Sequence, residues 1–466
     1  MNNKRQHRSR ESEVLPLGKG LGWDNIYFIG IGGIGMSALA RYFQANNFYV
    51  SGYDKTPSPV TNALEALGIV IHFDDNIDAI SKQVFNKEKT LIVYTPAIPK
   101  DHQEYNYFKD QGYTIYKRSE ILGAITKNTF CFAVAGTHGK TTTSTILGHI
   151  LHESGVNATS FLGGIAENYN SNLILGGDEI SVVEADEFDR SFLQLSPNMA
   201  CITSMDADHL DIYGEEEALT ESFIDFSNKV SDQLFIRKGL PIKGITYGIE
   251  DGSDFEAQHI RIENGTYIFD IKTPTEIYKN IELNLSGRHN VLNTVVALAM
   301  ANSYGVPLAT IAKALLNFKG VQRRFTYKIK TNDLVLIDDY AHHPTEINAV
   351  ANAVKELYPN EKVLAVFQPH LFSRTRDFID DFASSLSKFD ELILLDIYPA
   401  REKPIEGVTS DWLLAKIDLG KKQISSKENV IKNIKASEAK IIVMIGAGDI
   451  GVLINEVKNE LLTING

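Results

Sequence analysis

Residues 130–147, FCFAVAGTHGKTTTSTIL, place an apolar run directly before a glycine-rich loop and a helix-forming segment. In such a phosphate-binding loop, backbone N–H groups at a helix N-terminus face the anion, a lysine adds positive charge, and the next hydroxyl residue binds Mg²⁺. Lys140 and Thr141 take these two positions, and Gly136 and Gly139 allow close approach of the backbone. The stretch therefore predicts a nucleotide phosphate site at the end of a strand.

The loop is a shortened variant of the usual pattern. Standard spacing would put a further glycine at position 134, where this chain has Val134. A Gly-Lys-Thr triplet arising by chance at a helix start is the alternative interpretation. The preceding strand and the following helix are the context that the motif requires, so they favour the functional reading.

Two acidic segments follow, each at the end of an apolar run: VVEADEFDRSF at 182–192 and SMDADHLDIYG at 204–214. Ligands of an open parallel sheet gather at the carboxyl ends of its strands, so both segments are expected beside the phosphate loop. Carboxylates there suit Mg²⁺ held jointly with phosphates. Any single Asp could instead be a solvated loop residue, but two such segments favour a site. The candidates are Glu184, Asp186, Glu187, Asp189, Asp206, Asp208, His209 and Asp211.

A second glycine-rich stretch, FIGIGGIGMSALA at 28–40, has Gly30, Gly32 and Gly35 in G-x-G-x-x-G spacing. Asp54 lies about twenty residues later, as in dinucleotide-binding proteins. An NAD-dependent oxidoreductase is therefore one hypothesis. It leaves the phosphate loop and both acidic segments unexplained.

Apolar runs alternate with helical patterns along the chain, which predicts an α/β protein with three domains. We expect a disordered tail at 1–23, a Rossmann-like domain at 24–121 around the second glycine-rich stretch, and two further α/β domains at 122–321 and 322–466. Polar alternation between about Leu234 and Leu285 predicts a small antiparallel insertion in the central domain.

The 466 residues have a net charge of −13, and 43% of them are hydrophobic. This acidic balance argues against a nucleic-acid partner. The basic, polar N-terminus is not a secretory signal, and no apolar run is long enough to insert into a membrane, so a cytoplasmic protein is expected. Cys131 and Cys201 lie in strand-like apolar runs, which indicates buried thiols.

The motifs GTHGKTTT, EADEFDRSF, DADHLDIYG, GRHNVLN, DDYAHHPTE and FQPH-x-x-x-R-T-R-D together resemble those of the Mur ligases of peptidoglycan synthesis. The likeness runs from Ile26 to the GAGDIG at 446–451. It implies an N-terminal domain for a UDP-sugar, a central domain with a parallel sheet like that of P-loop ATPases, and a Rossmann-like C-terminal domain that brings in the amino acid.

The resemblance points to the branch that joins L-alanine to the lactyl carboxylate of UDP-N-acetylmuramate. The γ-phosphoryl group of ATP would pass to the carboxylate, and the amine of L-alanine would attack the acyl phosphate, releasing ADP and phosphate. A carboxylate is a poor electrophile, and phosphorylation turns its oxygen into a leaving group. Two anions must meet, so the site needs preorganised positive charge.

The resemblance assigns Lys140 to the β- and γ-phosphates of ATP. It makes Thr141 and Glu184 ligands of one Mg²⁺, and His209 the ligand of a second. From spacing alone Asp208 would be expected in place of His209, because Mg²⁺ prefers oxygen. The remaining expected ATP contacts are Gly136, Thr137, His138, Gly139, Thr142, His289, Asn290, Asn293, Arg324 and Asp339.

Asn290 and Asn293 lie three residues apart and so share a helix face, where amides can both donate to and accept from adenine. An N-cap role for Asn290 is the alternative. For the UDP-sugar, the resemblance implies a site around the first glycine loop. Its expected members are Gly30, Gly32, Gly33, Gly35, Met36, Ser37, Asp54 and Thr95.

Tyr340, His342, His343 and Arg374 match the region that receives L-alanine, and Arg374 would bind the alanine carboxylate through its fork of donors. Leu371 departs from some members, which carry Arg or Thr there. Arg374 and Arg376 could instead form ordinary ion pairs with Asp377 or Asp380.

Two further alternatives remain open. One is a ligase of the same family that recycles cell-wall peptides onto UDP-N-acetylmuramate, and the other is a non-catalytic, regulatory ATP binder. The expected partners are small molecules only, and the expected assembly is a monomer or a weak homodimer.

Overall fold

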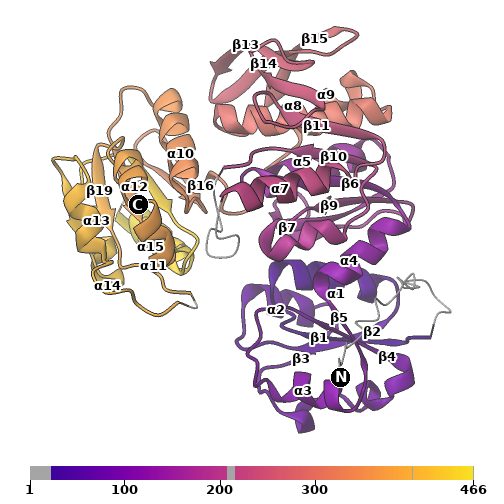
Figure 1. Cartoon of the computed structure of the whole chain (residues 1–466). Coiled ribbons are helices and arrows are strands. Elements are labelled where there is room, and N and C mark those ends of the chain that lie inside the picture. Colours follow the sequence, from indigo (N-terminus) through magenta and orange to yellow (C-terminus); the bar gives the residue numbers. More distant parts are fainter. Residues whose placement is uncertain (1–21, 207–215, 401, 465–466) are drawn as a thin grey trace, which may run out of the picture.

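Three β-sheets, each with its own helices, follow one another along the chain in the computed structural model (Figure 1). The structure describes residues 22–206, 216–400 and 402–464. Of the predicted tail at 1–23, the described residues include only 22 and 23. Of the acidic segment at 204–214, they include only 204–206. The sheets have five, ten and six strands, so the predicted three-domain α/β architecture is confirmed.

The N-terminal sheet is wholly parallel and has the strand order β3-β2-β1-β4-β5. β1 stands at its centre, and the chain reverses its direction of progress across the sheet there, which is where α/β sheets bind ligands. The elements are β1 (Asn25–Ile29), α1 (Ile34–Ala45), β2 (Tyr49–Tyr53), α2 (Pro59–Glu65), β3 (Val70–His72), β4 (Thr90–Tyr94), α3 (Gln103–Asp110), β5 (Thr114–Lys117) and α4 (Arg118–Lys127).

The middle sheet has the order β15-β14-β13-β12-β11-β10-β6-β9-β7-β8. Its centre is β6 (Phe130–Ala135), flanked in parallel register by β9 (Ile180–Glu184) and β10 (Met199–Ile202). The other elements are α5 (Lys140–Glu153), β7 (Ala158–Ala166), β8 (Ser171–Ile174), α7 (Glu216–Ser227), β11 (Gln233–Arg237), β12 (Ile245–Ile249), β13 (Phe255–Glu263), β14 (Thr266–Lys272), β15 (Ile277–Leu283), α8 (Arg288–Tyr304) and α9 (Leu308–Leu316).

The antiparallel part of the middle sheet is shorter than the sequence pattern suggested. β11 and β12 pair in parallel register, and only the ladders β13–β14 and β14–β15 in this region are antiparallel. These three strands continue the edge of the main sheet instead of forming a separate unit. Alternation of polar and apolar residues indicates a strand with one solvated face. Such a strand can pair in parallel or in antiparallel register, so the alternation did not reveal the direction of pairing.

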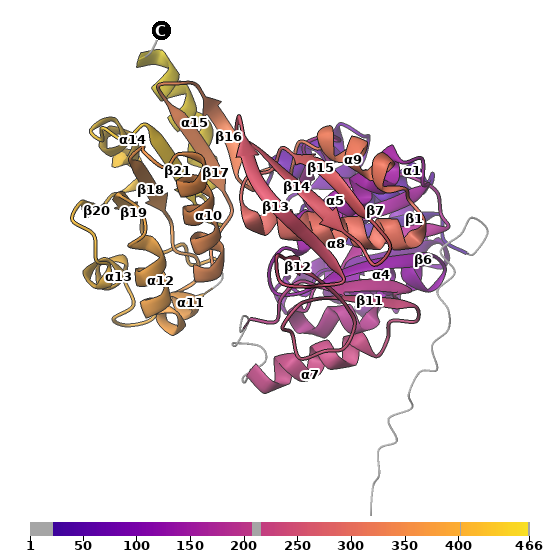
Figure 2. The same cartoon turned by 90° about the horizontal axis from the view of Figure 1, so that it is seen from above.

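The C-terminal sheet has the order β16-β17-β21-β18-β19-β20, with β16 alone antiparallel. Figure 2 shows this part of the chain standing beside the other two. Its elements are β16 (Thr326–Lys330), β17 (Val335–Asp339), α10 (Pro344–Leu357), β18 (Val363–Phe367), α11 (Phe372–Asp377), α12 (Ile379–Leu386), β19 (Glu391–Leu394), α13 (Ser410–Lys416), β20 (Lys422–Ile424), α14 (Lys427–Lys435), β21 (Ile441–Ile445) and α15 (Ile450–Ile464).

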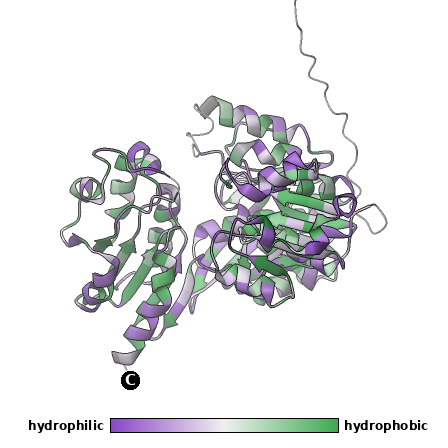
Figure 3. Ribbon diagram, turned by 90° about the horizontal axis from the view of Figure 1, so that it is seen from below, coloured by the Kyte–Doolittle hydropathy of each residue, from purple (hydrophilic) through white to green (hydrophobic). Residues whose placement is uncertain are grey.

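The central strands are apolar on both faces because helices cover both sides of each sheet (Figure 3). β1, β17, β18 and β21 are buried along their whole length, as are Cys131 and Cys201 in the middle sheet. Within the described residues, no helix is long and apolar enough to cross a membrane.

Candidate active site

The phosphate loop at 136–139 joins β6 to α5, as predicted, and its two glycines are required by the geometry. Gly136 has φ +131° and Gly139 has φ +82°, a region that L side chains rarely adopt. A Cβ on Gly136 would lie 2.1 Å from Thr203 Oγ1, and one on Gly139 would lie 2.6 Å from Asn293 Oδ1. The loop therefore packs against the end of β10 on one side and against α8 on the other.

Lys140, the first residue of α5, reaches back over the loop. Its Nζ donates to Gly136 O at 2.7 Å and forms an ion pair with Glu187 at 2.8 Å. Burial opposes the ammonium charge, but the carboxylates of Glu187, Asp186 and Glu184 outweigh it and raise the pKa of Lys140. The lysine is thus a charged group held in place by a fully buried carboxylate, Glu187, to which the sequence reasoning gave no specific role.

Thr141 and Glu184, predicted as metal ligands, lie in direct contact. The Thr141 hydroxyl donates to both carboxylate oxygens of Glu184, at 3.1 and 3.0 Å. Burial raises the pKa of Glu184, and the nearby Lys140 opposes that rise. A hydroxyl and a carboxylate beside a phosphate loop form a hard oxygen donor set, which fits Mg²⁺. The predicted ligand His209 lies outside the described residues, as does Asp208.

A cavity of about 260 Å³ opens in front of the phosphate loop, between the middle and C-terminal parts of the chain. All of the predicted ATP contacts except Gly136 line it, although they come from four separate stretches of sequence. These residues are Thr137, His138, Gly139, Lys140, Thr141, Thr142, His289, Asn290, Asn293, Arg324 and Asp339. Glu184, a predicted metal ligand, and His342, from the predicted amino-acid region, line the same cavity.

The N-terminus of α8 forms one wall of the cavity. The helix is capped by Gly287, so the alternative that Asn290 serves as its N-cap is wrong. Asn290 instead bonds Ser286 O through its amide nitrogen at 2.8 Å, and Asn293 donates to Asn290 Oδ1 at 3.4 Å. Burial, together with the nearby charge of Arg324, lowers the pKa of His289 to about 4. The imidazole of His289 is therefore neutral at physiological pH.

Arg324 and Asp339 face the cavity from the C-terminal part of the chain. The Asp339 carboxylate accepts the backbone N–H groups of Phe325 and Ala341, both at 2.7 Å. Burial raises the pKa of Asp339 to about 6, against the opposing charge of Arg324. Asp339 thus holds the backbone of Phe325 against the end of β17. This contact also fixes the backbone position of Arg324, the residue before it.

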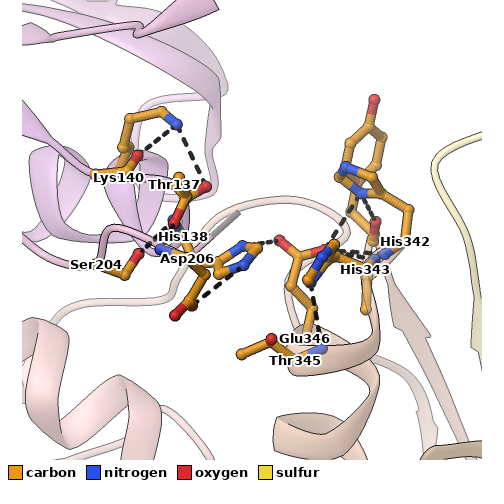
Figure 4. A network of polar contacts seen from close by, with 12 residues as sticks. Thr137, His138, Lys140, Ser204, Asp206, His342, His343, Thr345 and Glu346 are labelled. Carbon is orange, nitrogen blue, oxygen red and sulfur yellow. Dashed lines mark hydrogen bonds and ion pairs between the residues drawn. The ribbon is translucent and has the colours of Figure 1, made fainter. Parts of the chain in front are cut away.

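Glu346, which the sequence analysis did not single out, connects the phosphate loop to α10 (Figure 4). His138 of the loop lies between Asp206, at 3.6 Å, and Glu346, at 3.5 Å. Arg324 Nη1 lies 3.7 Å from the same carboxylate. Burial would raise the pKa of Glu346, but His342, His138 and the Arg324 guanidinium beside it hold that pKa well below its usual range.

The sequence did contain a signal for Glu346. His343 is the N-cap of α10 and Glu346 stands three residues later, in the position of a capping-box acid. Its Oε2 accepts the backbone N–H of His342 at 2.9 Å. Arg237 and Tyr247 also line the cavity without having been predicted; Arg237 ends β11, so its place at a strand end was the available clue.

Three of the four predicted amino-acid contacts cluster at the start of α10. The rings of Tyr340 and His342 lie edge to face at 5.5 Å, and the ring of His343 lies 4.8 Å from that of His138. Burial lowers the pKa of His342. The fourth, Arg374, is buried at 7% exposure in α11. It lies close enough to lower the pKa of His342, so the structure brings it to the same region.

The alternative of an ordinary ion pair holds for Arg376, whose Nε lies 2.7 Å from Asp377. Asp380 pairs with Lys416 instead. Leu371, the unusual residue of this motif, is the N-cap of α11 and has φ +73°. Such a conformation in a non-glycine residue is strained, and it is found here at the edge of the predicted amino-acid region.

The first glycine loop lies at the carboxyl ends of β1, β2 and β4. Gly32 N donates to Asp54 Oδ2 at 2.7 Å, and a Cβ on Gly30 would meet the Thr95 side chain at 2.6 Å. Gly33 is the N-cap of α1. The structure therefore brings together Gly30, Gly32, Gly33, Asp54 and Thr95. Asp54 holds the loop by accepting the Gly32 N–H. The corresponding acid of a dinucleotide site would instead contact a ribose.

The other three predicted residues of this stretch, Gly35, Met36 and Ser37, are buried or lie against a side chain from another element. Met36 and Ser37 are buried, and the Ser37 hydroxyl donates to Ile34 O at 2.9 Å. The amide of Asn172 in β8 donates to that hydroxyl at 2.8 Å. Ser37 thus joins α1 to the middle sheet in this structure. Gly35 lies against Arg118.

Known protein families match the chain in three consecutive pieces. Residues 25–129 match "Mur ligase family, catalytic domain", 134–301 match "Mur ligase middle domain", and 323–449 match "Mur ligase, glutamate ligase domain". These pieces follow the three sheets along the chain.

Among curated proteins, the chain is 63% identical to the UDP-N-acetylmuramate–L-alanine ligase of Flavobacterium psychrophilum, covering 94% of this chain and 98% of that one. It is 60% identical to the ligase of the same name from Flavobacterium johnsoniae, with the same coverage. The solved UDP-N-acetylmuramate–alanine ligase of Thermotoga maritima is 27% identical, with a TM-score of 0.81 over 94% of this chain and 99% of that one. A murein peptide ligase from Psychrobacter arcticus is 25% identical, with a TM-score of 0.69 over 94% and 98%. On its sequence and its fold, the chain belongs to the Mur ligase family.

Proposed function

We propose that this protein is an ATP-dependent ligase that joins L-alanine to the lactyl carboxylate of UDP-N-acetylmuramate in peptidoglycan synthesis. One observation carries the proposal: the chain is 63% identical over 94% of its length to a relative with that name. Lys140 and Thr141 of the phosphate loop stand at the start of α5, as the proposal requires. The predicted ATP contacts from the middle and C-terminal parts line one cavity, which supports it. Both nucleotide substrates belong to the cytoplasm, where we place the reaction.

In this proposal the three parts of the chain have separate tasks. Residues 24–121 bind the UDP-sugar, 122–321 bind ATP, and 322–466 bring L-alanine and close the ATP cavity. Lys140 contacts the β- and γ-phosphates, and Asn290 and Asn293 contact adenine. Arg374 binds the carboxylate of L-alanine near Tyr340, His342 and His343.

The chain's own residues supply positive charge and orientation for two steps. The lactyl carboxylate oxygen attacks the γ-phosphorus, and ADP leaves. The amine of L-alanine then attacks the carbonyl carbon, the phosphate leaves with the carboxylate oxygen, and the nitrogen loses its extra proton. Lys140 and Arg324 line the cavity where negative charge is concentrated during the first step.

Two Mg²⁺ ions belong to the proposal. Thr141 and Glu184 would hold the first, and His209 the second. When bound, the metal neutralises phosphate charge and polarises the γ-phosphoryl group.

Phosphate release from ATP with UDP-N-acetylmuramate tests the function. We expect release with L-alanine and little with the tripeptide L-Ala-γ-D-Glu-meso-diaminopimelate. Release with the tripeptide alone would instead make the chain a recycling ligase. Binding of ATP without turnover on any amino acid would favour the regulatory alternative, and hydride exchange with NADH would favour the oxidoreductase.

A further inference from the structure

Arg118, to which the proposed function gives no task, lies between the first turn of α1 and the acidic segment that follows β9. It is the first residue of α4, and it follows β5 at the edge of the N-terminal sheet. Its guanidinium covers the first turn of α1: a Cβ on Gly35 would lie 2.5 Å from Arg118 Nη1. The absence of a side chain at Gly35 is thus what lets a cation approach the N-terminus of α1.

The other side of the same guanidinium faces the middle part of the chain. Arg118 Nη2 lies 3.5 Å from Asp186 Oδ2, in the acidic segment that follows β9. This separation is longer than a usual N–H···O hydrogen bond, and both side chains are partly open to solvent, at 26% and 39% exposure. A long, half-exposed pair of this kind contributes little to stability, so exchange of partners costs little.

Arg118 lines a second cavity, of about 160 Å³, whose walls come from α1, α4 and β7. Glu184 lines both this cavity and the ATP cavity, so the two meet at the proposed metal ligand. Arg118 is the cationic side chain among the described residues that line the second cavity, where Glu184 and Asp186 are the acidic ones.

The proposed substrate must cross this region. Its diphosphate belongs at the first glycine loop, and its lactyl carboxylate must reach the γ-phosphate near Lys140. An anion passing Asp186 and Glu184 would be repelled unless a cation compensated for them. A planar guanidinium suits either a phosphate or a carboxylate, because it offers paired donors.

We propose that Arg118 is a substrate-binding residue that exchanges Asp186 for an anionic group of the UDP-sugar when that substrate binds. The inference rests on the proposed function, since it takes the UDP-sugar as the substrate. In this structure Asp186 is the acidic side chain paired with the Arg118 guanidinium. With substrate bound, Arg118 would compensate the negative charge of either the diphosphate or the lactyl carboxylate.

Calorimetric titration of the full chain with UDP-N-acetylmuramate tests this. We expect Arg118→Ala to weaken binding by about tenfold to a hundredfold, as for loss of a charge-assisted hydrogen bond. We expect Arg118→Lys to be intermediate. Arg261→Ala is the matched control, because it removes an exposed arginine paired with Glu263 on distant β13. Titration with UDP-N-acetylglucosamine, which lacks the carboxylate, locates the contact: an equal loss assigns the diphosphate, and no loss assigns the carboxylate.

Asp186→Asn separates substrate binding from a purely structural role. It removes the resting partner of Arg118 but keeps the cation, so we expect affinity for UDP-N-acetylmuramate to be unchanged or higher. If Arg118 only braced the two parts of the chain, both variants would lose thermal stability alike and Arg118→Ala would keep wild-type affinity, which would overturn the inference. Turnover of the wild type with L-alanine tests the proposed function separately. If the wild type does not bind the UDP-sugar, both the proposed function and this inference are wrong.

Discussion

At the scale of single residues, the cations of the proposed ATP site are held by carboxylates. Lys140 pairs with Glu187, and Arg324 lies beside Glu346. Each pairing keeps a long side chain ordered where phosphate oxygens are expected. Ordering before binding lowers the entropic cost when the ligand arrives.

Replacement of Lys140 tests its proposed place in the chemistry. We expect Lys140→Ala to lower turnover by about a hundredfold or more, as for the loss of a key electrostatic donor. Phosphate release at saturating substrates measures the effect. Lys355→Ala, on the far part of α10, is a control for loss of a lysine. Turnover close to that of the wild type would remove Lys140 from the mechanism.

A buried carboxyl far from the ATP cavity predicts a pH-dependent stability. Tyr27 Oη donates to Glu104 Oε2 at 2.5 Å, and His72 Nε2 lies 3.4 Å from Glu104 Oε1. Burial raises the pKa of Glu104 to about 7, with Asp75 nearby adding to the rise. A raised pKa means that the folded state binds the proton more tightly than the unfolded state. This stabilisation is complete below pH 4.5 and is lost as the pH rises through 7.

Glu104→Gln, which mimics the protonated acid, should therefore raise the melting temperature at pH 8, by about 4–8 °C for each kcal/mol in a domain of roughly 100 residues. At pH 5 the variant and the wild type should melt alike. Thermal unfolding at the two pH values checks this. A shift of equal size at both would mean that the Glu104 charge is not responsible.

At the scale of elements, both glycine loops have the same construction: a buried strand, a tight turn and the N-terminus of a helix. Their supports differ. The loop at 30–33 is held by Asp54 from the neighbouring strand end, and the loop at 136–139 is held by β10 and α8. In each case the support comes from an element distant in sequence.

The support from Asp54 leads to a prediction about UDP-sugar binding. The carboxylate accepts the Gly32 N–H and so holds the loop in place. A charge-assisted bond of this kind is worth roughly 1.5–3 kcal/mol. We expect Asp54→Ala to weaken binding of UDP-N-acetylmuramate by about tenfold and to leave ATP binding unchanged. Asp54→Asn, which keeps an acceptor, should lose less. Calorimetric titration with each nucleotide measures the difference, and an equal loss for ATP would indicate general unfolding instead.

At the scale of the whole molecule, the proposed reaction needs all three parts of the chain at one centre. His138 and Glu346 already join the phosphate loop to α10, and Ser37 and Asn172 join α1 to the middle sheet. An acyl phosphate must also be shielded from water, which closing of domains achieves.

We therefore expect the molecule to become more compact when ATP and UDP-N-acetylmuramate bind together. Small-angle scattering would show a smaller radius of gyration with both ligands than with either one. The Lys140→Ala variant should show less compaction with ATP. Dimensions that stay constant under all conditions would count against closure.

Most of the fold and of the ATP site could be predicted from local patterns. The strand–loop–helix units are contiguous, so their periodicity and glycines are visible in the sequence, and parallel topology brings strand ends to one edge. Glu346 and Arg237 were missed because their contacts come from other elements. The interpretation of Asn290 as an N-cap failed because helix starts are uncertain by a residue or more without the structure.

The sequence by itself determined which segments form strands, which loops cradle anions, and which family the motifs resemble, because each of these depends on residues close together in the chain. Only the tertiary structure decided that Glu346 meets His138, that Asp54 supports Gly32, and that Arg118 lies between α1 and Asp186. The Asp54 contact depends on the pairing of strands within one sheet, and the other two depend on how separate parts of the chain pack against one another. Charged residues make such contacts without any local periodicity that would reveal them.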